Sequence, residues 1–438
     1  MPDLALPVVT RPFRATLTPP GSKSLTNRAL ILASMAKGSS TLTNVLFADD
    51  TLVMIDALKA LGYELEVDRP NLTVHLTGTG GDIPAASADL FCGNSGTTLR
   101  FLAAALARGK GTYRLDGVPR MRQRPLGELG TLLKNMGVRI GYELDHGFPP
   151  LTITANRLPG GLLHFGSAMS SQYLSAVLMV APYARHEVRV ALTGKQTSWP
   201  YVSMTMRLMD HFGHLAELER DPDTGDPTKI VIPQGHYTGG RYAIEPDASN
   251  ASYFLAAAAL HPGSSITIDA LGSTSLQGDV AVAELLREMG ASVEVKRDQI
   301  TVTGTQTLRG ITADLSATPD IAQTLAVVAA FASSPSTFTG LHTLRVKETD
   351  RVAALQTELT KLGATVTIFD DHHLSLTVHP PYNTAHTPAA IDTYDDHRMA
   401  MSFALAATKI PGTVIRHPEC CAKTYPEFFT DFRKALGI

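Results

Sequence analysis

Six glycines recur along this chain at nearly constant spacing, and each closes a helix-like segment. The six copies are LKALG at Gly62, LKNMG at Gly137, MDHFG at Gly213, LREMG at Gly290, LTKLG at Gly363 and RKALG at Gly437. Successive copies lie 73 to 77 residues apart, a regularity that unrelated helix ends would hardly produce. Glycine directly after a helix is typical of a left-handed C-cap. The sequence therefore predicts six copies of one unit of about 75 residues.

Each of the first five copies has a recognisable back half and front half. After Gly62, for example, the extended segments YELEV and LTVHL follow, which predicts a pair of strands. A second helix comes earlier in each unit and is apolar nearly all round, as in LRFLAAALA at 99–107. A helix without a polar face must be buried on all sides. With one strand before each helix, the unit is predicted to be βαβαββ, and the chain to be an α/β (α+β) protein.

The domain organisation follows from the last repeat, which ends at Ile438 without its final hairpin. We expect the N-terminal strand candidates PVVT and FRATL to complete it, which brings both termini into one domain. The segments TPPG and GHYTGG then carry the chain between two domains. The predicted domains are residues 21–240, with repeats one to three, and residues 1–20 plus 241–438, with repeats four to six, joined by a two-segment hinge near 18–21 and 235–241.

Charge and hydropathy exclude several classes of partner. Lys and Arg total 38 and Asp and Glu total 41, giving a net charge of −3 without any long charge block, which argues against nucleic-acid binding. The longest aliphatic and aromatic run, from Leu325 to Ala332, is far shorter than the roughly 20 residues of a membrane span. The first residues lack the pattern of a secretory signal. We therefore expect a cytoplasmic monomer that binds neither nucleic acid nor membrane.

Cysteine and histidine usage predicts neither disulfides nor a metal site. Three cysteines, Cys92, Cys420 and Cys421, cannot form a disulfide framework and lack zinc-site spacing. The pair His372 and His373 lies in a polar stretch typical of a solvated hairpin turn, because a metal site needs several convergent ligands.

Polar segments of small residues precede all six buried helices: GSKSLTNR, CGNSGTTLR, SAMSSQ, EPDASN, ATPDIAQ and DTYDDHR. Helix capping explains any one of them. Six together, with Lys23, Arg28, Arg100 and Arg398 in or beside them, predict helix N-termini that face an anionic ligand. Two further segments carry clustered charge, namely GVPRMRQRPLGEL at 117–129 and RVKETDRV at 345–352. Each has a solvated charged loop or helix start as its ordinary explanation, and phosphate or carboxylate recognition by arginine as the alternative.

These segments resemble a known family when they are taken together and in order. The motifs are GSKSLTNRA, GNSGTTLRFLAAAL, RMRQRPLGEL, SSQYLSAVLM, RVKETDR, DDHRMAM and AKTYPEFF. From about residue 19 to about residue 430 the chain is similar to the 5-enolpyruvylshikimate-3-phosphate synthases, which are enolpyruvyl transferases. The resemblance implies the enolpyruvyl transferase fold, with two pseudo-symmetric domains of three βαβαββ units each, and this agrees with the period found independently.

The resemblance also implies a reaction. Members of the family transfer the enolpyruvyl group of phosphoenolpyruvate to the 5-hydroxyl of shikimate 3-phosphate and release phosphate, by addition and elimination through a tetrahedral intermediate. This step belongs to chorismate and aromatic amino acid biosynthesis, and it uses no metal and no organic cofactor. Both substrates carry phosphate and carboxylate groups, so cations and helix N-termini suit them.

Site residues follow from the resemblance, position by position. The implied catalytic set is Lys23, Asp320 and Glu348, where Asp320 faces the attacking hydroxyl as base, Glu348 exchanges the proton at the CH2 carbon and Lys23 assists at the phosphate. The implied shikimate 3-phosphate contacts are Lys23, Ser24, Arg28, Ser170, Ser171, Gln172, Ser198, Tyr201, Asp320 and Lys347. The implied phosphoenolpyruvate contacts are Lys23, Gly96, Arg124, Gln172, Arg351, Arg398 and Lys423. Two positions depart from the family pattern: Thr343 stands where some members have asparagine, and Phe101 where proline is common.

Three alternatives to this function exist. The first is the sister enzyme that transfers the same group to UDP-N-acetylglucosamine, but it typically begins with G-S-K-N and has a cysteine in the loop aligned with 117–124, where this chain has Ser24 and no cysteine. The second is an RNA 3′-phosphate cyclase-like protein, against which the net charge of −3 argues. The third is a non-catalytic phosphoanion-binding scaffold, against which the presence of Lys23, Asp320 and Glu348 argues.

Overall fold

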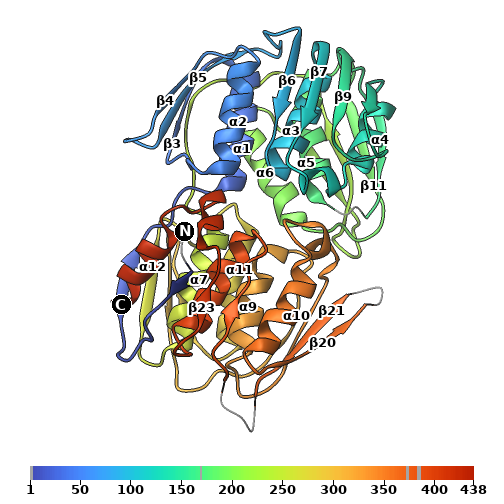
Figure 1. The fold of residues 1–438 in the computed structure, drawn as a ribbon. Coiled ribbons are helices and arrows are strands. Elements are labelled where there is room, and N and C mark those ends of the chain that lie inside the picture. Colours follow the sequence, from blue (N-terminus) through green and yellow to red (C-terminus); the bar gives the residue numbers. More distant parts are fainter. Residues whose placement is uncertain (1–2, 168–169, 371–373, 382–385) are drawn as a thin grey trace. The chain divides into compact units, whose positions relative to one another are not determined.

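The computed structural model describes residues 3–167, 170–370, 374–381 and 386–438 (Figure 1). The chain forms two compact units, the first comprising residues 21–244 and the second residues 1–20 with 245–438. Each unit is built from three copies of the repeat. Both ends of the chain belong to the second unit.

The second repeat shows the pattern most completely. Its elements are β6 (Ser87–Phe91), α3 (Gly96–Ala107), β7 (Lys110–Asp116), α4 (Gly127–Asn135), β8 (Arg139–Tyr142) and β9 (Leu151–Asn156). The sheet order is β6-β7-β9-β8. Strands β6 and β7 are parallel, because a helix connects them, and the hairpin β8–β9 is antiparallel. The predicted βαβαββ unit is confirmed.

The other repeats of the first unit follow the same plan. The first repeat consists of β14 (Arg241–Ala243), α1 (Lys23–Met35), β3 (Lys37–Thr43), α2 (Asp49–Ala60), β4 (Leu65–Asp68) and β5 (Thr73–Thr79). The third consists of β10 (Gly161–Phe165), α5 (Ser171–Val180), β11 (Val188–Leu192), α6 (Trp199–His211), β12 (Glu217–Arg220) and β13 (Pro227–Ile232).

The second unit contains repeats four to six. The fourth consists of β2 (Arg14–Leu17), α7 (Ala248–Leu260), β15 (Ser265–Asp269), α8 (Val282–Glu288), β16 (Ser292–Val295) and β17 (Gln299–Thr303). The fifth consists of β18 (Thr312–Asp314), α9 (Ala322–Ala329), β19 (Ser336–Thr339), α10 (Arg351–Lys361), β20 (Thr365–Phe369) and β21 (Ser375–His379). The sixth consists of β22 (Ala390–Ile391), α11 (His397–Ala407), β23 (Val414–Ile415) and α12 (Phe428–Leu436), with β1 (Leu4–Ala5) as its third strand.

The glycine period marks real helix ends. Gly62, Gly137, Gly213, Gly290, Gly363 and Gly437 all have φ between 70° and 109°, the left-handed region in which glycine carries no Cβ penalty. The apolar helices form the cores, as predicted: every residue of α3 and of α7 is buried. Helices α1, α3 and α5 pack in the first unit, and α7, α9 and α11 in the second.

The expected role of the N-terminal strands was correct in part, because β1, just before PVVT, completes the sheet of the sixth repeat. FRATL does not complete the sixth repeat, because β2 pairs in parallel with β15 and supplies the first strand of the fourth repeat. PVVT forms no strand, and the preceding residues Leu4 and Ala5 pair with β23 instead. Conversely, β14 pairs in parallel with β3, so the first repeat takes its first strand from residues 241–243. The chain therefore enters the first unit after Pro20 and leaves it after Ile244, beyond the GHYTGG segment.

Among the described residues, no helix has both the length and the apolar content that a bilayer span requires.

Candidate functional site

The site residues of the first unit lie at the N-termini of its three buried helices. Helix α1 begins at Lys23 after the cap Ser22, α3 begins at Gly96 after the cap Ser95, and α5 begins at Ser171 after the cap Ser170. In each case the serine hydroxyl accepts a backbone N–H of the first turn, which fixes where the helix starts. The predicted polar entrances are therefore helix caps as well as candidate ligand contacts.

Asp50 joins the first two of these N-termini. The Lys23 ammonium lies 3.3 Å from the buried Asp50 carboxylate. The backbone carbonyl of Asp50 accepts from Ser95 Oγ at 3.3 Å and from Thr98 Oγ1 at 3.0 Å. One residue at the start of α2 thus holds Lys23 of α1 beside the first turn of α3. Asp50 was not predicted from the sequence, although an acid pair at the start of a helix was a visible signal.

Gln172 joins the second and third N-termini. Its Nε2 donates to Thr97 Oγ1 at 3.2 Å, and its Oε1 accepts from Arg100 Nη1 at 2.7 Å. Arg100 also donates to the carbonyl of Pro125 at 3.2 Å, which adjoins Arg124. Arg100 is not among the contacts that the resemblance implies for either substrate, yet its hydrogen bonds connect α3 to Gln172 of α5 and to the Pro125 carbonyl.

Arg124 lies directly on the N-terminus of α3. A Cβ built on Gly96 would lie 2.6 Å from Arg124 Nη2 and 2.8 Å from its Cζ, so the position accepts only glycine while the guanidinium stays there. Arg124 Nη1 donates to the Asn94 carbonyl at 2.9 Å, and the side chain is 4% exposed. The structure therefore brings Gly96 and Arg124 together, two residues that the sequence analysis had assigned to the same ligand.

Arg28 lies deeper, behind the surface residues of this corner. It donates to Thr205 Oγ1 at 2.7 Å, to the Ser24 carbonyl at 2.9 Å and to the Tyr201 carbonyl at 3.4 Å. Burial lowers the pKa of Arg28 to about 9, and the Phe101 ring lies 5.0 Å from its guanidinium carbon. Arg28 thus positions Ser24 and Tyr201.

Ser198, Ser170 and Ser171 complete the predicted set in this unit. Ser198 precedes α6 with φ 53° and ψ 40°, a left-handed conformation in a non-glycine residue, and it is buried. Ser171 is buried in the first turn of α5, and Ser170 caps that helix.

The site residues of the second unit form a cluster of ions around Asp320. This residue lies in a 3₁₀ turn, Pro319–Ile321, directly before α9. Its Oδ2 accepts from Arg398 at 2.9 Å, and its Oδ1 lies 3.3 Å from Arg351 Nη1 and 3.4 Å from Lys347 Nζ. Three cations on one carboxylate stabilise its ionised form.

Arg351 connects Asp320 to two further carboxylates. Arg351 is 1% exposed, and it donates to Glu348 at 2.8 Å and to Asp396 at 2.7 Å. Lys423 lies 3.9 Å from the other oxygen of Glu348. Asp396 also caps α11 by accepting from Arg398 N at 2.9 Å, so it fixes both arginines. The predicted residues of the second unit are all in this one network, whereas Asp396 was missed as a member.

Burial and neighbouring charge shift the pKa values of two side chains in or beside this cluster, Lys347 and Asp279. Burial lowers the pKa of Lys347, while Asp320 acts in the opposite direction. Burial and the negative charge of Asp320 raise the pKa of Asp279 to about 6. The Asp279 carboxylate accepts a hydrogen bond from Ser249 in the first turn of α7.

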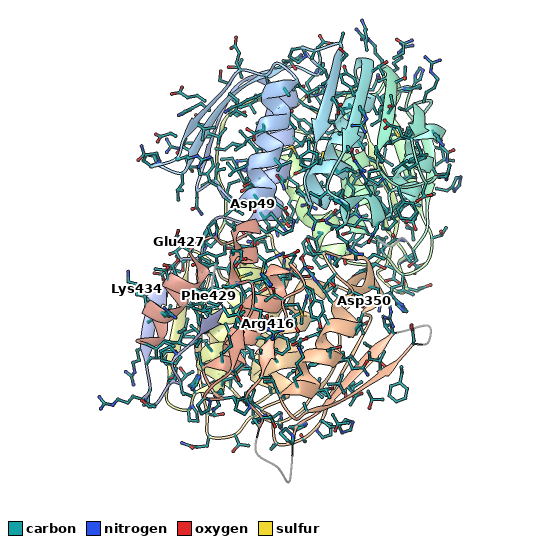
Figure 2. All side chains as sticks on the ribbon, in the orientation of Figure 1. Asp49, Asp350, Arg416, Glu427, Phe429 and Lys434 are labelled. Carbon is teal, nitrogen blue, oxygen red and sulfur yellow. The ribbon has the colours of Figure 1, made fainter. Side chains whose placement is uncertain are left out.

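The start of α10 orients Arg351 and Glu348. Asp350, labelled in Figure 2, caps this helix by accepting from the backbone N–H of Val352 and Ala353, each at 3.1 Å. The cap fixes the helix start at Arg351, and Glu348 precedes it by three residues. The charged segment 345–352 is thus a helix entrance in which functional and capping residues alternate.

Within the described ranges, no group of three or more His, Cys, Asp or Glu side chains is arranged to hold a metal ion. The expected turn at His372 and His373 lies outside the described residues.

Comparison with known proteins gives consistent matches over almost the whole chain. Residues 9–432 match the family model for EPSP synthase (3-phosphoshikimate 1-carboxyvinyltransferase). The 3-phosphoshikimate 1-carboxyvinyltransferase of Trichormus variabilis is 43% identical over 438 residues, covering 100% of both chains. The chloroplastic enzyme of Brassica napus is 43% identical over 445 residues, covering 98% of this chain and 84% of that one.

Solved structures show the same likeness in the fold. EPSP synthase from Acinetobacter baumannii superposes with a TM-score of 0.81 at 27% identity, covering 98% of this chain and 97% of that one. The enolpyruvyl transferase NikO from Streptomyces tendae superposes with a TM-score of 0.72 at 19% identity, covering 97% and 95% respectively, a likeness of fold alone.

Proposed function

The chain belongs to the EPSP synthase family, and on that premise we propose how its own residues carry out the family's reaction. It is a 3-phosphoshikimate 1-carboxyvinyltransferase, which transfers the enolpyruvyl group of phosphoenolpyruvate to shikimate 3-phosphate. The observation that carries the function is the match of residues 9–432 to this family. The assignment of residues to steps is supported by the two clusters described above.

The first unit supplies most of the proposed substrate contacts. Helix N-termini present free N–H groups and partial positive charge, which suit phosphate and carboxylate. The proposed contacts to shikimate 3-phosphate are Lys23, Ser24, Arg28, Ser170, Ser171, Gln172, Ser198 and Tyr201 of the first unit and Asp320 and Lys347 of the second. The proposed contacts to phosphoenolpyruvate are Lys23, Gly96, Arg124 and Gln172 of the first unit and Arg351, Arg398 and Lys423 of the second.

The proposed addition step uses both carboxylates of the second unit. The 5-hydroxyl oxygen of shikimate 3-phosphate bonds to C2 of phosphoenolpyruvate, and its proton passes to Asp320. The CH2 carbon receives a proton from Glu348 and becomes a methyl group, which gives the tetrahedral intermediate. General acid and base groups of opposite starting protonation are what this step requires. Three cations favour the ionised form of Asp320, as a base requires. Arg351 and Lys423 favour the ionised form of Glu348 as well, so Glu348 must take up a proton before it can act as the acid.

The proposed elimination step reverses the proton flow. The bond from C2 to the phosphate oxygen breaks, the methyl group returns a proton to Glu348, and the double bond forms again. The positive charge of Lys23 assists the leaving phosphate, and Asp50 holds the Lys23 ammonium in place. Lys347 lies 3.4 Å from Asp320 and holds this carboxylate in place through the step.

Phosphate release is the experiment that tests the function. With phosphoenolpyruvate present, we expect release to depend on shikimate 3-phosphate and to be at least about 1,000-fold slower with UDP-N-acetylglucosamine, because a site built for one set of polar groups rejects another. The sugar-nucleotide alternative is not favoured, since the loop 117–124 holds no cysteine. Comparable release with both acceptors would contradict the proposed specificity.

A cytoplasmic location and a monomeric state remain predictions. Cell fractionation with an antibody against the chain tests the first. Light scattering at several protein concentrations tests the second, and a mass near 46.8 kDa is the expected result.

A further inference from the structure

A cavity of about 480 Å³ lies in the first unit, at the opposite ends of the buried helices from Gly96 and Lys23. Arg108 directly follows α3, and the Tyr183 hydroxyl donates to the carbonyl of Met35, the last residue of α1. Since a helix rises about 1.5 Å per residue, the two ends of α3 lie roughly 17 Å apart. This cavity is therefore separate from the Gly96–Arg124 corner, and its volume is within the range of small-molecule sites.

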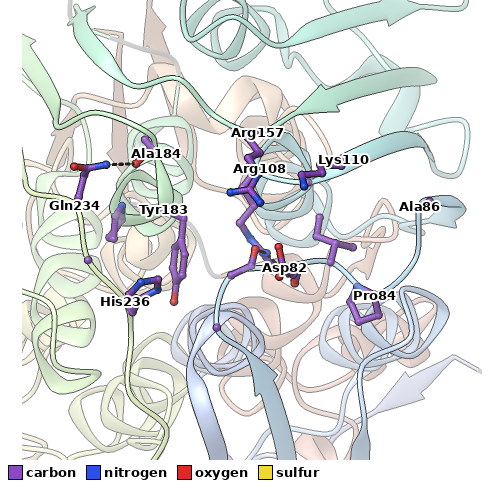
Figure 3. Close-up of a pocket in the computed structure, with 16 residues that line it drawn as sticks. Asp82, Pro84, Ala86, Arg108, Lys110, Arg157, Tyr183, Ala184, Gln234 and His236 are labelled. Carbon is purple, nitrogen blue, oxygen red and sulfur yellow. Dashed lines mark hydrogen bonds between the residues drawn. The ribbon is translucent and has the colours of Figure 1, made fainter.

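Arg108 forms a fixed positive charge at the cavity (Figure 3). It donates to the Tyr63 hydroxyl at 2.7 Å, to the Asp82 carbonyl at 3.1 Å and to the Gly81 carbonyl. The side chain is 5% exposed, so its position is set before any ligand arrives. All three bonds go to neutral oxygens, which orient the guanidinium without neutralising it.

Two more cations, Lys110 and Arg157, are held beside it by the sheet. Lys110 starts β7 and pairs in register with Asn156 of β9. The next residue, Arg157, has φ 62°, and its N–H donates to the Gly109 carbonyl at 2.8 Å. Both side chains are exposed, and in the described part of the chain neither makes an ion pair.

The remaining walls are aromatic and polar. The rings of Tyr183 and His236 meet edge to face with centroids 5.5 Å apart, and the guanidinium carbon of Arg108 lies over the Tyr183 ring, 5.9 Å from its centroid. Gly81 has φ 114°, and a Cβ there would lie 2.4 Å from the Tyr183 ring, so the loop and the ring are closely packed. Asp82 is the one carboxylate among the lining residues.

We propose that this cavity binds a small multivalent anion carrying phosphate or carboxylate groups, at a site distinct from the substrate contacts. Arg108, Lys110 and Arg157 would hold the charged groups, and Tyr183 and His236 the body of the ligand. The lining comes from the segment between the first and second repeats, from the second and third repeats and from the segment that leaves the unit, at 80–84, 86, 108–110, 157, 182–184 and 234–236. An occupant would therefore link these parts and stabilise the unit, because it binds only the folded chain.

The test compares the parent chain with two double variants of equal charge. Lys110→Ala with Arg157→Ala removes the two exposed cations of the cavity. Lys59→Ala with Arg207→Ala removes two exposed cations elsewhere in the same unit and serves as the matched control. Inorganic pyrophosphate and citrate are titrated into each protein by calorimetry, and the melting temperature is measured with and without each anion. Pyrophosphate probes phosphate recognition and citrate probes carboxylate recognition.

We expect the parent and the control to show one binding event that the cavity variant lacks or shows at least about tenfold weaker, with a matching rise in melting temperature. The preferred anion identifies the ligand chemistry. Binding at the substrate contacts is common to all three proteins and cancels in the comparison. Turnover of the cavity variant should stay within about twofold of the parent, and its melting temperature without anion reports whether it folds. Equal anion binding in all three proteins, or none in a parent chain that is folded and active, would overturn the proposal.

Discussion

The two functional clusters hold their arginines in different ways. In the first unit, Arg100 and Arg124 donate to the carbonyls of Pro125 and Asn94 and to the amide of Gln172. In the second unit, Arg351 and Arg398 donate to carboxylates, among them Asp320. A neutral oxygen positions a guanidinium without offsetting its positive charge. A carboxylate partner offsets that charge, and the arginine in turn holds the carboxylate in place and favours its ionised form.

We propose that the two units have different tasks, although they share one repeat: the first unit binds the anions, and the second holds the acid and base groups. Substitutions in the first cluster should therefore act mainly on KM, and substitutions in the second mainly on kcat. The first cluster also contains an ion pair, between Lys23 and Asp50.

The largest effect is expected for Asp320→Asn. The amide keeps the shape of the side chain and can still accept from Arg398, but it cannot take the proton of the substrate hydroxyl. We expect kcat to fall by about 10²- to 10⁴-fold, the usual contribution of a general base, while shikimate 3-phosphate binding stays close to that of the parent. Steady-state kinetics and calorimetry measure the two quantities. Asp298→Asn, in an exposed turn of the same unit, is the control, and a kcat for Asp320→Asn within a few-fold of the parent would refute the assignment.

A smaller effect, on binding, is expected for Gly96→Ala. The new Cβ would lie 2.6 Å from Arg124 Nη2, so the guanidinium must move away from the N-terminus of α3. We expect KM for phosphoenolpyruvate to rise about tenfold and kcat to change less. The reason is that Arg124 binds this substrate about equally in the ground state and in the transition state, so its displacement weakens binding more than it slows the reaction. Gly141→Ala is the matched control, since a Cβ there meets no atom within 4 Å. An unchanged KM in Gly96→Ala would show that Arg124 does not contact this substrate.

The smallest effect concerns the pH dependence of stability through Asp279. Its pKa in the folded chain is raised from 3.8 to about 6, so between about pH 4 and pH 6 the folded chain keeps a proton that the unfolded chain has released. The contribution of Asp279 to stability therefore becomes less favourable as pH rises through this window. Asp279→Asn removes the titration, and the variant should gain stability relative to the parent from pH 4.5 to pH 7. Urea unfolding at both values measures this gain, and an equal difference at both would contradict it.

The repeat could be predicted from the sequence because each unit carries local signals. Glycine after a helix, such as Gly62 with φ 85°, takes the left-handed conformation that ends the helix without a Cβ penalty, and a helix that is apolar nearly all round, such as α3, is buried. The first strands carry no such signal. Both β2 and β14 are short, and only tertiary pairing decides that β2 joins β15 and β14 joins β3. Sequence reasoning therefore assigned FRATL to the wrong repeat.

The candidate site also contains residues that the sequence can identify and residues that only the tertiary structure reveals. Residues inside ordered motifs, such as Lys23 and Glu348, could be named from the resemblance. Their partners could not, because the pairs form across long separations: Arg351 and Asp396 lie 45 residues apart, and Arg100 and Gln172 lie 72 apart. Asp396 reads as a helix cap in the sequence, and only the structure shows that it also orients Arg351.

The most direct test of the division of tasks is the rate at which deuterium enters the CH2 group of phosphoenolpyruvate and product during turnover in D2O. If Glu348 exchanges the proton at this carbon, Glu348→Gln should slow incorporation by about 10²-fold or more, as expected for loss of a general acid. Gly96→Ala, given saturating phosphoenolpyruvate, should stay within a few-fold of the parent. Parent-like incorporation in folded Glu348→Gln, or an equal loss in both variants, would contradict the account that the second unit moves the protons and the first binds the anions.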